Sequence, residues 1–576
     1  MGSTSTISLY SHPKLSHRAQ PVLSRSFCQA RDAPLSFALP FSGTRRCFRL
    51  KRLVVKAAAR PEGGRRQRRV YRQSQSDNAL TTAPVKQIAS FVVPAGVFVS
   101  ATFVQLTVLW KLVEKLLMPK PSRPSKPTAE GMNWSVGAGT NLLSGFTGKL
   151  FRESKQTLNE FAKELRAFSS VDMSGRNFGD EGLFFLAESL GYNQTAEEVS
   201  FAANGITAAG IKAFDGVLQS NIALKTLNLS GNPIGDEGVK CLCDILVDNA
   251  GVERLQLSSV DLRDEGAKAI AELLKNNSIL RVLELNNNMI DYSGFTSLAE
   301  ALLENSTIRS LHLNGNYGGA LGANALAKGL EGNKSLRELH LHGNSIGDEG
   351  IRALMSGLSS RKGKLAVLDI GNNSISAKGA FHVAEYIKNC KSLLWINLYM
   401  NDIGDEGAEK IADALKQNRT ITTIDLLDLA YNPIGADGAK ALSEVLKFHG
   451  NINTLKLGWC QIGAIGAEFV ADMLRYNNTI SILDLRANGL RDEGAKCLAQ
   501  SFKVVNEALT SIDLAFNEIR DDGAFAIAQA LKANEDVAVT SLNLANNFLT
   551  KFGQSALTDA KDLVYEMSEK EVNIFF

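Results

Sequence analysis

The stretch from Leu393 to Thr420 reads LLWINLYMNDIGDEGAEKIADALKQNRT, and variants of it occur fourteen times between Phe168 and the C-terminus. The copies begin at Phe168, Ala196, Leu224, Val252, Leu280, Ile308, Leu336, Leu365, Leu393, Ile421, Ile452, Ile480, Leu509 and Val539. Most steps between successive copies are 28 residues, and the others are 29 to 31. A fixed period of this length indicates a stack of identical units rather than a globule around one pocket.

The first part of each copy predicts a short strand. Apolar residues occupy its first, fourth and sixth positions, as in Leu336, Leu339 and Leu341. Alternation at the fourth and sixth positions is typical of a strand with one buried face. Most copies have asparagine at the ninth position, for example Asn232 and Asn401. Because the asparagine amide both donates and accepts, a column of these side chains can satisfy backbone groups where the chain leaves the strand.

The second part of each copy predicts a turn and then a helix. The motif I-G-D-E-G supplies a turn glycine such as Gly235, and we expect the aspartate that follows it, Asp236, to cap the helix. Apolar residues then recur at helical spacing, as in Ala408, Ile411 and Leu415. Many helices end at an asparagine such as Asn277, which we expect in the left-handed conformation. The repeated Asp-Glu pairs therefore predict helix caps and no catalytic or metal-binding acids.

The pattern L-x-x-L-x-L-x-x-N followed by one helix resembles the leucine-rich repeat, from Phe168 to about Met567. The 28-residue length and the GDEGA motif resemble the ribonuclease-inhibitor-like subfamily, which includes the C-terminal regions of NOD-like receptors and the GTPase-activating proteins of Ran. The resemblance implies an α/β horseshoe solenoid with a parallel β-sheet on the concave face and α-helices on the convex face. Physical spacing favours the same shape, because strands stack about 4.8 Å apart and helix axes about 8 to 10 Å apart.

The N-terminal region resembles a targeting sequence. Residues 1–60 contain eleven Lys and Arg against one acid, Asp32, together with many serines. This composition predicts a plastid transit peptide over 1–57, with a mitochondrial address as the alternative. The stretch from Leu53 to Arg60, LVVKAAAR, resembles a stromal processing site. We therefore expect a chloroplast protein, with a basic disordered segment at 58–85 after the transit peptide.

Four further segments complete the predicted domain organisation. Residues 86–117 form a hydrophobic helix whose 88–110 part either spans a membrane as a tether or docks on the solenoid. Residues 118–140 are a Pro-rich linker. We expect 141–167 to form a capping helix before the repeat domain at 168–567, since terminal repeats need a cover. Residues 568–576 are predicted as a C-terminal tail.

Charge and cysteine patterns exclude several functions. The net charge of +3 combines +17 in residues 1–135 (22 Lys and Arg against 5 Asp and Glu) with −14 in the rest. An acidic repeat region argues against nucleic-acid binding. The seven cysteines include no CxxC pair, and no phosphate-binding loop or nucleophile motif is recognisable. The sequence therefore predicts a protein that is not an enzyme and has no cofactor and no metal.

The fifth position of each copy should face the concave side, where a solenoid binds partners. This column is mostly acidic or hydrogen-bonding and includes Asp425. Exposed aromatic residues beside it are of the kind that anchors interfaces. The predicted partner-binding residues are Glu284, His312, His340, His342, Asp369, Trp395, Asn397, Tyr399, Lys456, Trp459, Asp484, Arg486 and Asp513.

Two local features stand out from the regular repeat. His312, His340 and His342 should lie within about 5 to 8 Å of one another by strand geometry. They could bind a metal or sense pH, but without a zinc signature we predict a polar recognition patch. The copy at Ile421 has three extra residues, LLDLAYN, and the next has Cys460 in the asparagine position. These changes indicate either a bulge that shapes a binding site or a tolerated insertion.

The sequence thus favours a plastid scaffold or assembly factor that binds a protein on its concave face. One alternative is a GTPase-activating protein like the Ran regulators, although the plant members carry an N-terminal domain that this chain lacks. Another is an immune-receptor-like repeat protein, although no nucleotide-binding module is recognisable. The identity of the partner and the oligomeric state stay open.

Overall fold

The computed structural model describes residues 156–576 except 192, 419–423, 503–506 and 535–537. The chain divides into two units, Met1–Met132 and Asn133–Phe576, and every described residue belongs to the second. The predicted transit peptide, hydrophobic helix and linker lie outside the described residues. Among the described residues, no helix is both long enough and apolar enough to cross a membrane.

The repeat unit contains one parallel sheet of fifteen strands, arranged in the order of the chain. Each strand has only three residues and pairs in register with the next, as where His312 faces His340. The strands are β1 Ser170–Asp172, β2 Glu198–Ser200, β3 Thr226–Asn228, β4 Arg254–Gln256, β5 Val282–Glu284, β6 Ser310–His312, β7 Glu338–His340, β8 Val367–Asp369, β9 Trp395–Asn397, β10 Leu426–Asp428, β11 Thr454–Lys456, β12 Ile482–Asp484, β13 Ser511–Asp513, β14 Ser541–Asn543 and β15 Asn573–Phe575.

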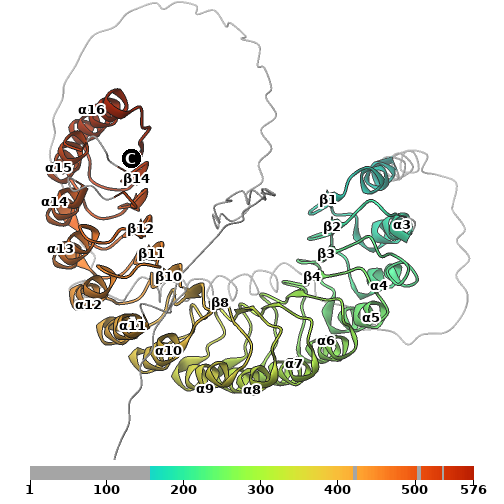
Figure 1. Ribbon diagram of the computed structural model, residues 1–576. Helices are drawn as coiled ribbons and strands as arrows, with labels where there is room; N and C mark the ends of the chain where they lie inside the picture. The colour runs from blue at the N-terminus through green and yellow to red at the C-terminus, as the bar shows by residue number, and fades with distance from the viewer. Residues whose placement is uncertain (1–155, 192, 419–423, 503–506, 535–537) are drawn as a thin grey trace, which may run out of the picture. The chain divides into compact units, whose positions relative to one another are not determined.

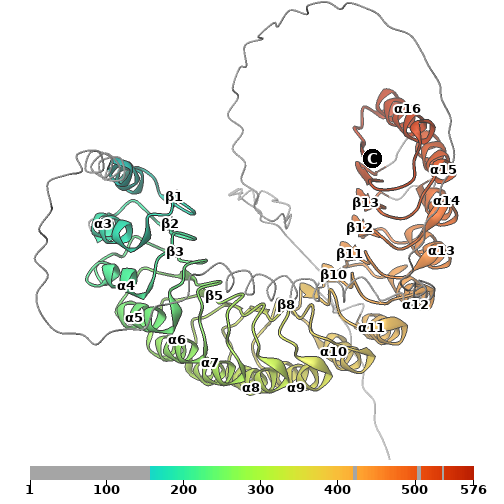
Figure 2. The same ribbon diagram turned by 180° about the vertical axis from the view of Figure 1, so that it is seen from behind.

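A helical segment follows each of the strands β1 to β14 and lies on the outer side of the arc, with the sheet on the inner side (Figures 1 and 2). The segments are α3 Gly179–Gly191, α4 Ala208–Ile211 with the 3₁₀ turn η1 Lys212–Phe214, α5 Gly235–Leu246, α6 Asp264–Asn276, α7 Tyr292–Glu304, α8 Gly319–Gly332, α9 Gly347–Ser360, α10 Ala377–Asn389, α11 Gly404–Asn418, α12 Ala436–Leu446, α13 Gly463–Leu474, α14 Arg491–Phe502, α15 Asp521–Lys532 and α16 Lys551–Ser568. The predicted solenoid, with a parallel sheet inside and helices outside, is confirmed.

The core lies between the sheet and the helices and continues through the whole stack. Leu227 and Leu229 from one strand region and Leu242 from the helix behind it are all fully buried. Each fully buried leucine contributes about 1.5 to 3 kcal/mol. Because each repeat covers its neighbour, the apolar residues form one continuous cluster.

Where a repeat has asparagine at its ninth position, this side chain joins the repeat to the preceding one. Nδ2 of Asn232 donates to the carbonyls of Phe201 (3.0 Å) and Leu229 (2.8 Å). Its Oδ1 accepts from the backbone N–H groups of Asn204 (2.8 Å) and Ile206 (3.0 Å). The predicted asparagine column is therefore confirmed, and it satisfies turn groups that the three-residue strands leave unpaired.

The aspartate of the GDEG motif caps the helix of the next repeat, so the expectation that it caps its own helix was wrong. Asp236 is the second residue of α5, and its Oδ1 accepts from the N–H groups of Arg263 (2.7 Å) and Gly266 (3.0 Å) at the start of α6. Equivalent bonds occur at Asp264, Asp348, Asp405 and Asp492. A Cβ atom at Gly266 would lie 2.6 Å from this carboxylate oxygen, which explains the second glycine of the motif.

The asparagines after the helices form a second column, and the left-handed conformation expected for them was wrong. Asn277 has φ −91° and ψ 129°, which is extended. Its Nδ2 donates to the carbonyl of Leu246 (2.9 Å) at the end of the preceding helix, and its Oδ1 accepts from the N–H of Leu280 (2.8 Å). Arg361 takes this place in one repeat and donates to the carbonyls of Asn333 and Leu336. Side-chain bonding between repeats therefore replaces a local helix stop.

The register of the repeat predicted to begin at Ile421 begins instead at Ile424. In β10, Leu426 pairs with Trp395 and Asp428 with Asn397. Asn432 therefore occupies the ninth position, and its Nδ2 donates to the carbonyl of Leu398 (2.9 Å). The extra residues precede the strand, so LLDLAYN contains no bulge. Consequently Asp428, and not Asp425, has the fifth position.

Both ends of the described stack carry additional structure. Residues 156–167, within the predicted capping segment, are helical, and Leu165 is fully buried. Arg176 of the first repeat forms an ion pair with Glu164 (3.0 Å) and lies over the ring of Phe161. The predicted tail contains β15, which pairs with β14. The sheet thus extends one strand beyond the fourteen repeats predicted from the sequence.

Replacing Asn232 with alanine should destabilise the solenoid strongly. The change removes five hydrogen bonds and leaves the buried N–H groups of Asn204 and Ile206 unpaired. We expect a loss of about 3 kcal/mol in the free energy of unfolding, measured by urea denaturation. The control is Asn276→Ala, which removes an exposed asparagine at a helix end. Equal midpoints for the two variants would contradict the role of the column.

Replacing Asp236 with alanine should weaken the following helix rather than its own. Its carboxylate binds the first turn of α6, so loss of this cap should cost about 1 kcal/mol. Hydrogen exchange should accelerate at the amides of Arg263 and Gly266. Glu237→Ala, at an exposed neighbouring position, is the matched control. Faster exchange confined to the start of α5 would show that the aspartate caps its own helix.

Candidate functional site

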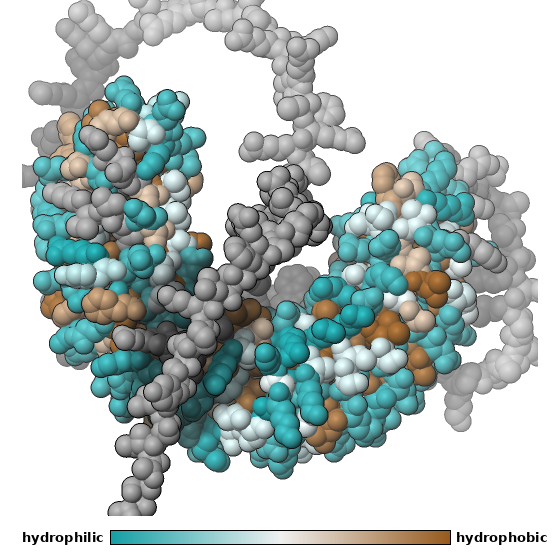
Figure 3. All heavy atoms as spheres, in the orientation of Figure 1, coloured by the Kyte–Doolittle hydropathy of each residue, from teal (hydrophilic) through white to brown (hydrophobic). Residues whose placement is uncertain are grey.

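The candidate site lies on the inner face of the sheet. In β1 to β14 the middle residue of the strand is buried, while the first and third turn away from the core. Side chains in register on neighbouring strands therefore lie side by side along this face, about 4.8 Å apart. Seen from one side of the arc, hydrophilic side chains cover most of the surface in view, and apolar ones occur singly or in small groups (Figure 3).

Two predicted histidines on neighbouring strands stack on each other. The rings of His312 and His340 have centroids 4.1 Å apart and an interplanar angle of 7°. Trp395 continues this group, with its ring 5.7 Å from His340. Burial, the neighbouring His340 and Arg254 lower the pKa of His312 to about 3. The imidazole of His312 is therefore neutral at physiological pH.

Asp369 lies at the centre of the histidine group. Its carboxylate oxygens are 3.7 Å from Nδ1 of His340 and 3.6 Å from Nδ1 of His342, and Asn397 donates to Oδ1 (2.8 Å). Burial by itself would raise the pKa of Asp369, but its interactions with His340 and His342 outweigh burial and lower it. Asp369 therefore holds the neighbouring polar side chains in place as a buried carboxylate.

Three of the six acidic residues in the fifth-position column are buried and paired, contrary to the expected exposed acidic stripe. Asp369, Asp428 and Asp484 are each less than 9% exposed. Lys456 pairs with Asp428 (3.2 Å). Arg486 donates to both carboxylate oxygens of Asp484 (Nε to Oδ1 3.1 Å, Nη2 to Oδ2 2.7 Å).

The remaining acids of the predicted set also have basic neighbours. Nε of Arg486 lies 3.7 Å from Oδ2 of Asp513. Glu284 pairs with Arg254 (3.4 Å) at the other end of the predicted surface. The inner face therefore presents paired charges, and its negative charge is largely compensated within the site.

Four aromatic side chains form a continuous row along the inner face: Tyr399, Tyr431, Trp459 and Phe516. Successive ring centroids are 4.8, 5.1 and 5.9 Å apart, and Tyr431 stacks on Trp459 at 17°. His342 joins the row to the histidine group, 6.0 Å from Tyr399. Burial, with Tyr431 and Asp428 nearby, raises the pKa of Tyr399 to about 12. Trp459 and Phe516 are 39% and 46% exposed, so the row presents apolar rings to solvent.

The sequence interpretation missed two members of the row. The repeat was predicted to begin at Ile421 and not at Ile424, so Tyr431 was assigned to the wrong position of the repeat. Phe516 was not considered. A signal for both existed: Tyr431, Trp459 and Phe516 share the eighth position once the register begins at Ile424. All three have a positive φ of 56° to 58°, and their rings contact one another. The sequence interpretation also missed Ser310 and Glu338, which lie beside the histidines.

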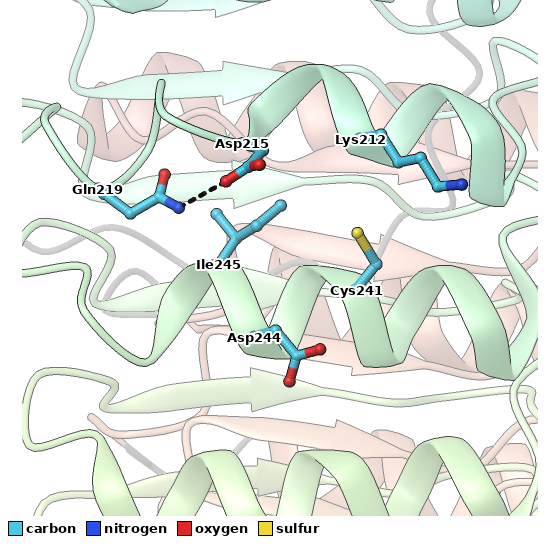
Figure 4. A pocket seen from close by; sticks show the side chains of 6 residues that line it. All are labelled: Lys212, Asp215, Gln219, Cys241, Asp244 and Ile245. Carbon is cyan, nitrogen blue, oxygen red and sulfur yellow. Dashed lines mark hydrogen bonds between the residues drawn. The ribbon is translucent and has the colours of Figure 1, made fainter.

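Two hollows lie on the outer, helical side. One of about 280 Å³ lies between η1 and α5 and is lined by Lys212, Asp215, Cys241 and others (Figure 4). Burial and the nearby Asp244 raise the pKa of the Cys241 thiol, so it is a poor nucleophile. The second, of about 730 Å³, is lined mainly by acidic side chains of α11 and α12. Neither hollow contains a recognisable catalytic arrangement.

Seven segments of the chain match the family model described as "Leucine Rich repeat". They are residues 220–243, 332–355, 389–412, 417–443, 451–471, 476–499 and 505–528. These segments of the chain are similar to leucine-rich repeats. This result agrees with the strand-and-helix repeat seen in the structure. No curated protein matches the sequence.

Several solved structures match this chain over most of their own length. They include an internalin from Listeria monocytogenes (16% identity, covering 71% of this chain and 92% of that one, TM-score 0.33). The Rad7 and Elc1 complex of yeast matches at 16% identity over 71% of this chain and 92% of that chain, with a TM-score of 0.39. A leucine-rich repeat protein of Leptospira interrogans matches at 16% over 73% and 98%, with a TM-score of 0.36.

Removing Arg486 should destabilise the C-terminal repeats through the buried carboxylate of Asp484. Arg486→Ala leaves that carboxylate without its bidentate partner. We expect the free energy of unfolding to fall by about 2 kcal/mol. This value is lower than for a fully buried ion pair because solvent screens the partly exposed arginine. Urea denaturation measures this loss. Arg254→Ala, which breaks a longer and more exposed pair, should cost less than about 1 kcal/mol. Similar losses for both variants would contradict this assignment.

Proposed function

We propose that this protein is a non-enzymatic scaffold or assembly factor that binds a protein partner on the inner face of its leucine-rich repeats. The aromatic row carries the proposal. Contiguous rings on a rigid sheet supply contact area at little entropic cost, and aromatic residues are enriched among the hot spots of interfaces. The row is fixed by stacking and by the strands beneath it, so its geometry exists before a partner binds.

The polar neighbours of the row favour a partner of mixed polarity. Arg486 lies near Tyr399 and Tyr431, and Lys456 and Arg486 each pair with a buried aspartate. These two side chains are 36% and 42% exposed and can donate hydrogen bonds to partner carboxylates or carbonyls. An interface with an aromatic centre and a polar rim is typical of protein–protein recognition.

The proposal includes a plastid location and a ribonuclease-inhibitor-like subtype. The arginine- and serine-rich N-terminus supports an organelle address, and the 28-residue repeat with GDEGA supports the subtype. The uncharged stretch at 88–110 would tether the repeats to a membrane. Imaging of a fluorescent fusion and carbonate extraction of isolated plastids test these parts separately from partner binding.

Removing two exposed rings of the row should abolish partner capture. The full-length protein serves as bait in plastid extract. The double variant Trp459→Ala with Phe516→Ala should reduce the recovery of inner-face partners at least about 10-fold. The reason is that each central aromatic anchor contributes about 1 to 2 kcal/mol or more to binding. Quantitative mass spectrometry of the captured proteins measures the change.

A matched double variant controls for the loss of exposed aromatic surface. Phe448 and Tyr476 are 68% and 58% exposed and contact each other at 6.1 Å, but they follow the outer helices α12 and α13. Phe448→Ala with Tyr476→Ala should leave inner-face partners bound. If the variant in the row retains every partner of the wild type, the proposal fails. Faster GTP hydrolysis by plastid GTPases on addition of the protein would favour the GTPase-regulator alternative.

A further inference from the structure

Two histidines and a glutamate converge at one point of the inner face, away from the aromatic row. His312 ends β6, while Glu338 and His340 begin and end the neighbouring strand β7. The register places His340 directly beside His312, and Glu338 two residues away on the same face. One ligand atom from each of the three lies within 4.8 Å of the other two, and all three residues are half-buried. Among the described residues, this is the one group of at least three such side chains with that spacing.

The ligand atoms of His312 and Glu338 are directed at a common point. The hydroxyl of Ser310 lies 2.8 Å from Nε2 of His312 and 2.7 Å from Oε2 of Glu338. Both atoms therefore point toward the same small region above β6 and β7. A serine hydroxyl reorients about its Cα–Cβ bond at low energetic cost, so it can yield this region to a cation.

The third ligand is oriented by a carboxylate behind it. Nδ1 of His340 lies 3.7 Å from Oδ2 of Asp369, which leaves Nε2 of His340 as the nitrogen available to a cation. Asp369 is itself held by Asn397 (2.8 Å) and by the N–H of Gly371 (3.2 Å). A buried carboxylate behind a histidine is the arrangement that orients metal-bound imidazoles and raises their basicity.

We propose that His312, Glu338 and His340 bind one zinc ion on the inner face of the sheet. Two imidazole nitrogens and one carboxylate oxygen are ligands that zinc accepts, at about 2.0 to 2.2 Å each. Ligand atoms of a tetrahedral ion lie roughly 3.4 Å apart, so the half-buried side chains close the site by rotating, which takes the rings of His312 and His340 out of their stacked arrangement. Three protein ligands leave a fourth position, directed away from the sheet, for water or an added ligand. This inference does not depend on partner binding.

Metal titration of the full-length chain tests the proposal. After removal of metal by chelation and dialysis, zinc binding is measured by calorimetry and by metal analysis. The wild type should bind one zinc ion that is lost in His340→Ala and Glu338→Gln. Loss of outer-sphere partners costs about 10- to 100-fold in affinity, so loss of a direct ligand should cost at least about 100-fold. Circular dichroism establishes that each variant is folded.

A histidine elsewhere in the chain provides the matched control. His382 lies on the outer helix α10 against Phe381, and His382→Ala should keep the zinc ion with unchanged affinity. Cobalt provides a second readout, because a site of nitrogen and oxygen ligands gives visible absorption without the charge-transfer band of a thiolate. Equal zinc binding by wild type, His340→Ala and Glu338→Gln would overturn the proposal. So would a wild type that retains no zinc, or a cobalt spectrum showing cysteine ligands.

Discussion

The asparagine that follows most of the strands is the constraint on which the rest of the structure depends. Strands of three residues pair few backbone groups, so the chain leaves the sheet with buried N–H and C=O groups unsatisfied. Asn232 satisfies such groups in its own repeat and in the preceding one. Since a buried unpaired amide costs about 1 to 3 kcal/mol, each repeat is held at one distance and one register from its neighbour.

Two further kinds of contact between repeats also hold each repeat in place against its neighbour. Aspartates such as Asp236 bind the N-terminus of the next helix, and asparagines such as Asn277 bind the end of the preceding one. Both ends of a helix are thus satisfied partly by side chains from other repeats. The stack is stabilised as a unit, and its inner face is a rigid grid of side chains on which rings and charges keep fixed distances.

Rigidity of the grid explains how the candidate sites arise. Wherever neighbouring strands carry large side chains at facing positions, those side chains must touch, as His312 and His340 do. For the same reason Tyr431 contacts Trp459. The shorter side chains of Asp369 and Asp484 are covered by larger neighbours and are buried. Stacked rings therefore remain exposed while the small acids become buried supports.

The sequence by itself determined the repeat, the strand and helix of each unit, the buried apolar positions and the inward direction of His312, because all follow from periodicity within 28 residues. It did not determine which helix Asp236 caps, the role of Asn277 or the start of the repeat at Ile424. Those features depend on hydrogen bonds and strand pairing between residues about 28 positions apart, which local propensity does not contain. Only the tertiary structure decided that the aromatic rings form one row and that the acids are paired, since both depend on the distance between stacked repeats.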